Sequence, residues 1–156
     1  MHDYNLLVGQ LDLDSILMSD KTELAVPRLN KFSKSKILFP GQTLKEYDAQ
    51  APLGRTLYWA PELCMEEAYD FKIDIWSFGV ILYFLLTGQT HVPSRKDEAV
   101  QRKEILEKDY LIKPLEQRNV SVHAMDLVKR CLTKDPNKRL TSKQVLQHAW
   151  FKAIFD

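Results

Sequence analysis

Residues 58–88 read YWAPELCMEEAYDFKIDIWSFGVILYFLLTG, and the second half of this stretch decides the fold. The run from Ile75 to Leu86 is apolar almost throughout. It has about 12 residues, well short of the roughly 20 that a membrane-spanning helix needs. A short helix that is apolar on all sides belongs in a protein core, and Gly88 is well placed to end it in the left-handed conformation. The stretch therefore predicts a buried central helix over about 72–87.

The composition favours one ordinary globular domain. The chain has 156 residues, enough to bury a single core without disulfides or a structural metal. Its 22 basic and 21 acidic residues give no basic excess, which argues against a nucleic-acid partner. Cys64 and Cys131 are isolated, so we expect buried thiols in a reducing compartment rather than a zinc site. No secretory signal opens the sequence, and we expect an intracellular, cytoplasmic protein without membrane contact.

The segments on either side of the central helix differ in character. Compact apolar runs at 5–9, 15–19 and 23–29 predict short strands. Residues 31–56 have no periodicity and contain two prolines and two glycines, so they predict a long loop. Helices are predicted after Pro61. Ser94 is expected to cap a charged helix that runs to Lys108, and Thr141 with Gln144 forms a capping box at the start of a later helix. Between them, a third helix has an apolar face of Val122, Met125, Leu127, Val128, Cys131 and Leu132.

Three ordered motifs carry a family resemblance. YWAPEL at 58–63, DIWSFGVILYFLLTG at 74–88 and CLTKDPNKRLTSKQVLQHAWF at 131–151 resemble the C-terminal lobe (C-lobe) of eukaryotic protein kinases. The last motif is most similar to the calcium/calmodulin-dependent and calcium-dependent Ser/Thr kinases. The resemblance implies a mainly α fold, a helical bundle around the buried helix at about 72–87, with a few short strands near the N-terminus.

The same resemblance implies how a kinase-like C-lobe over 1–156 is organised. Residues 1–30 are similar to a catalytic-loop region, 31–62 to an activation segment, and 63–156 to the helical subdomain. The small N-terminal lobe of such kinases has no counterpart here, so we expect the chain to be a fragment.

Five residues match positions with architectural roles in the family. The resemblance implies that Glu62 pairs with Arg139, for which a planar bidentate guanidinium is well suited. It implies that Asp74 accepts backbone N–H groups of the catalytic loop, and that Trp76 and Gly79 allow close packing on the central helix. These roles indicate the fold and say nothing about activity.

The chemical positions of the family are replaced. Active kinases use H-R-D-L-x-x-x-N and D-F-G motifs to hold metal and orient the nucleophile. Aligned on the segment Ser15–Leu17, this chain has Gln10 at the catalytic Asp, Asp12 at the following Lys and Ser15 at the metal-binding Asn. Aligned on Phe32, it has Lys31 at the magnesium-binding Asp. An amide cannot accept a proton as a carboxylate does, and a lysine brings positive charge to the place of Mg²⁺. The five glycines form no GxG pair either.

Two of these substitutions leave alternatives open. Asp12 and Asp14 could point to one side of an extended segment and hold a cation, or they could be solvated turn acids. Lys31 could stand in for part of an ion's charge against a phosphate, or it could be a solvated loop lysine.

The long loop offers hydroxyl groups for phosphorylation. A phosphate there could pair with Arg55, Lys34 or Lys36. Arg55 also takes the place of the threonine that usually follows the glycine at position 54. The candidate acceptors are Ser33, Ser35, Thr43, Tyr47 and Thr56.

Together these features favour a pseudokinase. We expect a catalytically inactive scaffold or allosteric regulator that binds protein partners, such as an active kinase or its substrate. No cofactor, metal or nucleotide is expected for this chain. The alternative is the C-lobe of an active Ser/Thr kinase, for which MgATP would be the cofactor. A third hypothesis is a stability module without a binding role.

Overall fold

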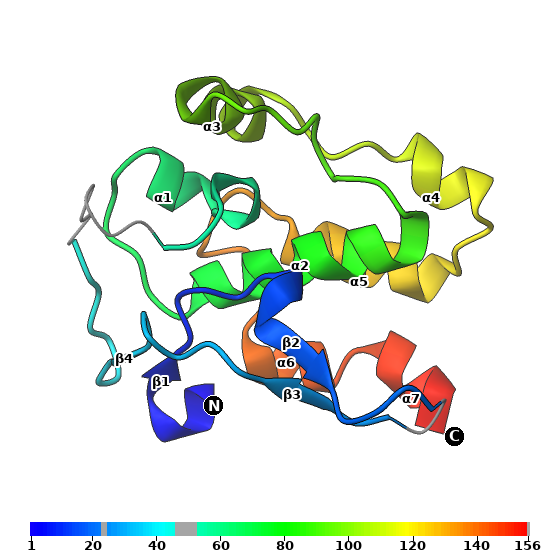
Figure 1. The fold of residues 1–156 in the computed structure, drawn as a ribbon, viewed down its shortest axis with the longest axis horizontal. Coiled ribbons are helices and arrows are strands. Elements are labelled where there is room, and N and C mark those ends of the chain that lie inside the picture. The colour runs from blue at the N-terminus through cyan, green and yellow to red at the C-terminus, as the bar shows by residue number, and fades with distance from the viewer. Residues whose placement is uncertain (23–24, 46–52, 156) are drawn as a thin grey trace.

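The computed structural model describes residues 1–22, 25–45 and 53–155, and it is mainly helical (Figure 1). This confirms the predicted fold class. The helices are α1 (Pro61–Cys64), α2 (Lys72–Thr87), α3 (Glu98–Glu107), α4 (Lys113–Gln117), α5 (Val122–Cys131), α6 (Ser142–Leu146) and α7 (Ala149–Phe155), with short 3₁₀ turns at His2–Tyr4, Leu13–Ser15 and Thr56–Tyr58.

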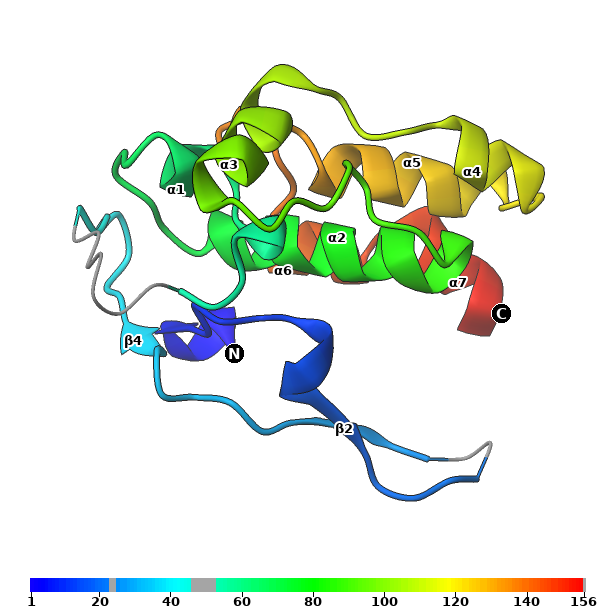
Figure 2. The same cartoon turned by 45° about the horizontal axis from the view of Figure 1, so that its top comes forward.

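Helix α2 is the centre of the molecule, as its apolar sequence predicts. It covers Lys72–Thr87 and buries residues on all sides, with α4 and α5 packed along it (Figures 1 and 2). Gly88 follows with φ 72°, and its N–H donates to the Phe84 carbonyl at 2.7 Å. The left-handed glycine therefore ends the helix where the sequence indicates.

Gly79 sets how closely α2 approaches α5. A Cβ atom added to Gly79 would lie 2.7 Å from the Cβ of Cys131 and 3.0 Å from Cδ2 of Leu132. Neither Cβ can move without shifting a helix backbone. The absence of a side chain at position 79 is thus a condition for the central packing.

Replacing Gly79 by alanine is expected to lower the free energy of unfolding by about 1 to 3 kcal/mol, the usual cost of overpacking. Helix propensity alone would favour alanine by roughly 0.5 to 1 kcal/mol, so the sign of the change decides between the two effects. Urea unfolding measures it. Leu85→Ala, on an exposed part of α2 (Leu85 is 68 % exposed), is the control and should stay within about 0.5 kcal/mol of wild type. A stabilised Gly79→Ala variant would contradict the packing argument.

Four short strands form two antiparallel pairs. Strand β1 (Leu6–Leu7) pairs with β4 (Lys36–Ile37), with Leu6 opposite Ile37. Strand β2 (Ile16–Met18) pairs with β3 (Pro27–Leu29), with Ile16 opposite Leu29. Figure 2 shows this part of the chain on one side of the helices. The three predicted strands are present in shortened form.

The prediction of an unbroken loop over 31–56 is wrong at β4. Leu38 is fully buried, and its N–H donates to the Asn5 carbonyl at 2.9 Å, which draws the segment onto β1. Leu44 also forms a β-bridge with Tyr69. Long-range burial thus gives structure to a segment without local periodicity.

The charged helix begins later than predicted. Helix α3 starts at Glu98, and Asp97 caps it by accepting the Val100 N–H at 3.0 Å. Ser94 is therefore not the cap. The reason is that the next residue, Arg95, donates its N–H to the Gln101 side chain at 2.6 Å and lies before the helix.

The other helix predictions have mixed outcomes. The capping box of Thr141 and Gln144 is confirmed at the start of α6. Val122 is 75 % exposed and does not belong to the buried face of α5. It is the first residue of the helix, which begins outside the core. Helix α4 was not predicted.

Both cysteines and the apolar helix α2 lie in the hydrophobic core. Cys64 and Cys131 are both buried and free, and burial raises the pKa of each thiol to about 12. Among the described residues, no helix combines the length and hydropathy required to cross a bilayer.

Candidate functional site

Asp74, in the first turn of α2, anchors the segment that resembles a catalytic loop. Its side chain is almost fully buried and accepts the N–H groups of Val8 at 2.8 Å and Gly9 at 2.9 Å. The His2 Nε2 atom lies 2.9 Å from the same carboxylate. A carboxylate that accepts several N–H groups holds them rigidly, so residues 8 and 9 are fixed to the central helix.

Gly9 and Ser35 bring the activation-segment-like residues against this loop. Gly9 has φ +75°, and a Cβ there would lie 2.8 Å from the Lys34 carbonyl oxygen. The Ser35 hydroxyl donates to the Val8 carbonyl at 3.0 Å. The two segments therefore meet, which places the substituted positions of both side by side.

Asp12 and Lys31 form an ion pair at this junction. The Lys31 Nζ atom lies 3.3 Å from Oδ1 and 3.5 Å from Oδ2 of Asp12. The Asp12 side chain is only 4 % exposed, whereas that of Lys31 is 32 % exposed. A nearly buried carboxylate needs a partner, and Lys31 provides it.

This pair corrects two of the interpretations made from sequence. Asp12 is not a solvated turn acid, because it is buried. Lys31 is not a plain solvated lysine, because its ammonium is bound to Asp12. The sequence did contain a signal: the motif alignment proposed above puts Asp12 at a lysine position and Lys31 at an aspartate position, which are two opposite changes of charge.

Asp14 has a different partner and does not join Asp12. Its exposed carboxylate contacts the guanidinium of Arg55, which is also exposed. Asp12 precedes the 3₁₀ turn Leu13–Ser15 and Asp14 lies within it, so the two are not in an extended strand, and each carboxylate has its own partner. The hypothesis of a shared cation site at these two residues is therefore wrong for this structure. Within the described ranges, no three His, Cys, Asp or Glu side chains form a group that could ligate a metal.

Ser15, at the position of the metal-binding asparagine, is fully buried and already bonded. Its hydroxyl donates to the Asp12 carbonyl at 2.6 Å and accepts the Asp12 N–H at 3.0 Å. These bonds close the turn that presents Asp12 to Lys31. The hydroxyl has a structural role in that turn.

The space beside Gln10 is very small. The cavity lined by Gln10, Gly54 and Tyr58 measures about 10 Å³, which is just enough space for one water molecule. A Cβ on Gly54 would lie 2.9 Å from the Gln10 side chain, so the glycine allows the close approach. The Gln10 side chain thus occupies most of the space at this point of the loop.

Glu62 and Arg139 form a buried bidentate ion pair. The two guanidinium nitrogens lie 2.7 and 2.9 Å from the two carboxylate oxygens, and both side chains are almost wholly buried. Arg139 also stacks over the Trp76 ring at 5.1 Å. The pair ties α1, which ends the activation-segment-like region, to the loop between α5 and α6.

The candidate phosphate acceptors lie in different environments. Ser33 and Thr43 are exposed, whereas Ser35 and Thr56 are partly buried. Ser35 uses its hydroxyl for the bond to Val8, which competes with modification. Tyr47 lies outside the described residues. A regulatory phosphosite remains a prediction.

Comparison with known proteins identifies the family. The model of the protein kinase domain matches residues 1–151. The chain is 34 % identical over 152 residues to calcium-dependent protein kinase 21 of Arabidopsis thaliana, covering 97 % of this chain and 27 % of that protein. It is 31 % identical over 157 residues to the calcium/calmodulin-dependent protein kinase cmkB of Emericella nidulans, covering all of this chain and 38 % of the relative.

A rice relative, calcium-dependent protein kinase 3 of Oryza sativa subsp. japonica, is 35 % identical over 151 residues, which are 97 % of this chain and 26 % of that protein. The chain thus spans about a quarter to two-fifths of the length of these relatives. The buried contacts of Glu62 with Arg139 and of Asp74 with the loop are those that the resemblance implies. With the match over residues 1–151, the chain belongs to the protein kinase domain family.

Proposed function

We propose that this chain is a catalytically inactive kinase C-lobe that acts by binding other proteins. The observation that carries the proposal is the ion pair of Asp12 and Lys31. Phosphoryl transfer in this family depends on carboxylates that hold metal ions against the phosphates. Here Lys31, which we align with the magnesium-binding Asp, forms an internal salt bridge with Asp12 instead.

The residues present do not fit Mg²⁺ and ATP. Magnesium requires oxygen ligands in near-octahedral geometry, whereas Lys31 puts an ammonium 3.3 Å from the buried carboxylate of Asp12. The Ser15 hydroxyl is engaged in its turn. Gln10 cannot take a proton from a substrate hydroxyl as an aspartate can. MgATP is therefore not a cofactor in this proposal.

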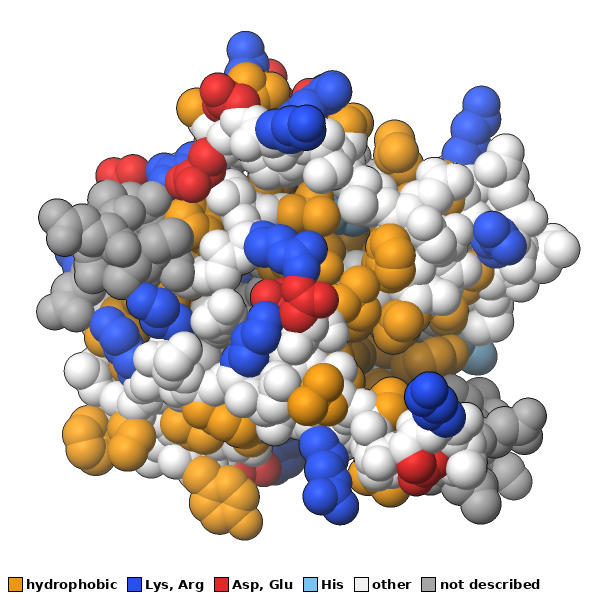
Figure 3. Space-filling view, in the orientation of Figure 1, with side chains coloured by type: hydrophobic (Ala, Val, Ile, Leu, Met, Phe, Trp, Pro, Cys, Tyr) orange, Lys and Arg blue, Asp and Glu red, His pale blue; other side chains and the backbone are white. Residues whose placement is uncertain are grey.

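The surface supports a role in protein binding. On the face seen in Figure 3, exposed hydrophobic side chains gather near the C-terminal half of α2, while basic and acidic side chains mix over α3. Leu85 on α2 and Ile112 beside α4 are 68 % and 55 % exposed. A mixed apolar and charged surface of this kind suits a regulatory contact with an active kinase or with its substrate.

The first test is transfer of labelled γ-phosphate from MgATP by the longest natural polypeptide that contains this segment. We expect no transfer above that of a Gln10→Ala/Lys31→Ala control. Transfer that is lost in the control would contradict the proposal. It would favour the alternative, an active Ser/Thr kinase whose chemistry uses these unusual residues.

The second test asks for metal binding and uses the chain alone. Mn²⁺, a paramagnetic substitute for Mg²⁺, should leave the N–H signals around Asp12 unbroadened in the wild type. Lys31→Asp places a second carboxylate beside Asp12 and should introduce site-specific broadening, because two acidic side chains form a cation site. Lys34→Asp, three residues away, is the control. Specific broadening in the wild type would count against inactivity.

A further inference from the structure

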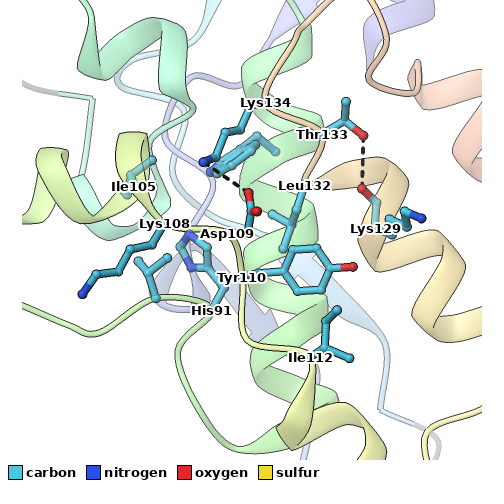
Figure 4. Close-up of a pocket in the computed structure, with 12 residues that line it drawn as sticks. His91, Ile105, Lys108, Asp109, Tyr110, Ile112, Lys129, Leu132, Thr133 and Lys134 are labelled. Atoms are coloured by element: carbon cyan, nitrogen blue, oxygen red, sulfur yellow. Dashed lines mark hydrogen bonds and ion pairs between the residues drawn. The ribbon is translucent and has the colours of Figure 1, made fainter.

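A hollow of about 400 Å³ opens beside α2 and shares no lining residue with the Asp12–Lys31 junction (Figure 4). It lies between Trp76 on α2, Ile105 on α3, Leu132 at the end of α5 and the connecting residues 108–112. Its volume falls in the range of about 300 to 1,000 Å³ typical of small-molecule sites. We call it the His91 pocket, after the residue that forms its floor.

The floor carries polar groups that have no partner. Among the described residues, neither ring nitrogen of His91 nor the indole Nε1 of Trp76 has a hydrogen bond, although His91 is 1 % and Trp76 3 % exposed. The two rings meet edge to face with centroids 5.9 Å apart. Buried polar side chains are almost always paired, so these nitrogens are polar groups beside the hollow that a ligand could pair with.

The charge state of His91 defines what that partner must offer. Burial lowers the pKa of His91 to about 4, so the imidazole is neutral at physiological pH. A neutral imidazole has one N–H donor and one acceptor nitrogen, and an indole has one donor. A hydroxyl, which both donates and accepts, complements this floor.

The walls and the mouth define the rest of the ligand. The walls are apolar and include Ile105, Tyr110 and Leu132. The lining also carries three lysines and one aspartate: Lys108, Lys129, Lys134 and Asp109. Figure 4 shows Lys134 paired with Asp109, at 3.3 Å, and Lys108 pairs with Glu104 outside the lining at 2.6 Å. Lys129 has no ion pair within the part of the chain that is described, so it is available to an anion.

We propose that the His91 pocket binds a small hydroxyaryl carboxylate. The aromatic ring packs between the apolar walls and the carboxylate faces Lys129 at the mouth. The hydroxyl reaches the floor, where a small rotation of the imidazole brings His91 into contact with it. This site is independent of the kinase-like site, so the proposal does not rest on the chain's inactivity.

The test is an NMR titration of the chain with 4-hydroxyphenylacetate, following the indole N–H signal of Trp76. We expect a saturable shift with a millimolar Kd, as suits a ligand of so few atoms. Two matched ligands separate the polar contacts. Phenylacetate lacks the hydroxyl, and 4-hydroxyphenylacetamide lacks the charge. Each should bind about two- to fivefold more weakly, the range for one exposed ion pair or one modest hydrogen bond.

Variants assign these losses to residues. Lys129→Gln should abolish the preference for the acid over the amide, whereas Lys138→Gln, on an exposed loop outside the pocket, should leave it unchanged. His91→Leu should abolish the preference for the hydroxyl while phenylacetate still binds. Absence of a saturable Trp76 shift would overturn the proposal. So would equal affinities for the three ligands, or an equal effect of the two lysine substitutions.

Discussion

Replacing Arg139 by leucine is expected to lower the free energy of unfolding by about 3 to 5 kcal/mol, the usual result of breaking a buried ion pair from one side. The guanidinium forms both bonds to Glu62 and also donates to the carbonyls of Lys72, Thr133 and Lys134 at 2.8 to 3.0 Å. Leucine removes both donors of the buried carboxylate and one donor from each of these carbonyls. Because the free energy of unfolding of such a domain is only about 5 to 15 kcal/mol in total, the loss is a large part of the stability.

Urea unfolding measures this effect, and a double-mutant cycle isolates the pair. Glu62→Leu with Arg139→Leu should cost less than the sum of the two single changes, because no unpaired charge remains. Arg139→Lys keeps the charge but not the bidentate fork, and should cost an intermediate amount. Exposed Arg118→Leu is the control, with a change of less than about 0.5 kcal/mol. A cost of under about 1 kcal/mol for Arg139→Leu would show that the pair does not hold the helices together.

Features set by local sequence were the ones that could be predicted. The central helix follows from one continuous apolar run, its end from Gly88, and the start of α6 from the spacing of Thr141 and Gln144. Each depends on residues within a turn or two. The start of α3 was predicted wrongly because Ser94 and Asp97 are both good caps, and the bond from the Arg95 N–H to the Gln101 side chain keeps residue 95 outside the helix.

The site was harder to predict because its contacts join distant residues. Asp12 and Lys31 are 19 residues apart, and they meet only because Asp74 holds the first segment and Ser35 joins it to the second. The comparison of motifs treated each residue as a separate loss. The structure shows the two side chains as partners in one ion pair, in which each provides the charge that the other requires.

Replacing Asp74 by asparagine is expected to lower the free energy of unfolding by about 2 to 4 kcal/mol. The change keeps the shape but removes one acceptor oxygen and the negative charge, so one of the buried N–H groups of Val8 and Gly9 loses its bond. An unpaired buried donor costs about 1 to 3 kcal/mol, and a bond to a charged group is stronger than one to an amide. His2 also loses the carboxylate that lies 2.9 Å from its ring.

The decisive measurement is hydrogen exchange at the Val8 and Gly9 amides, alongside urea unfolding. Both amides should exchange faster in Asp74→Asn by more than global destabilisation explains, because their own acceptor has changed. Asp97→Asn is the matched control: asparagine caps a helix about as well as aspartate, so stability and both amides should be unaffected. Unchanged exchange at Val8 and Gly9 would contradict the anchoring role of Asp74. Since that anchor also positions the segment that carries Asp12, the variant should weaken the contact with Lys31, and the Lys31 side chain should become more mobile as a result.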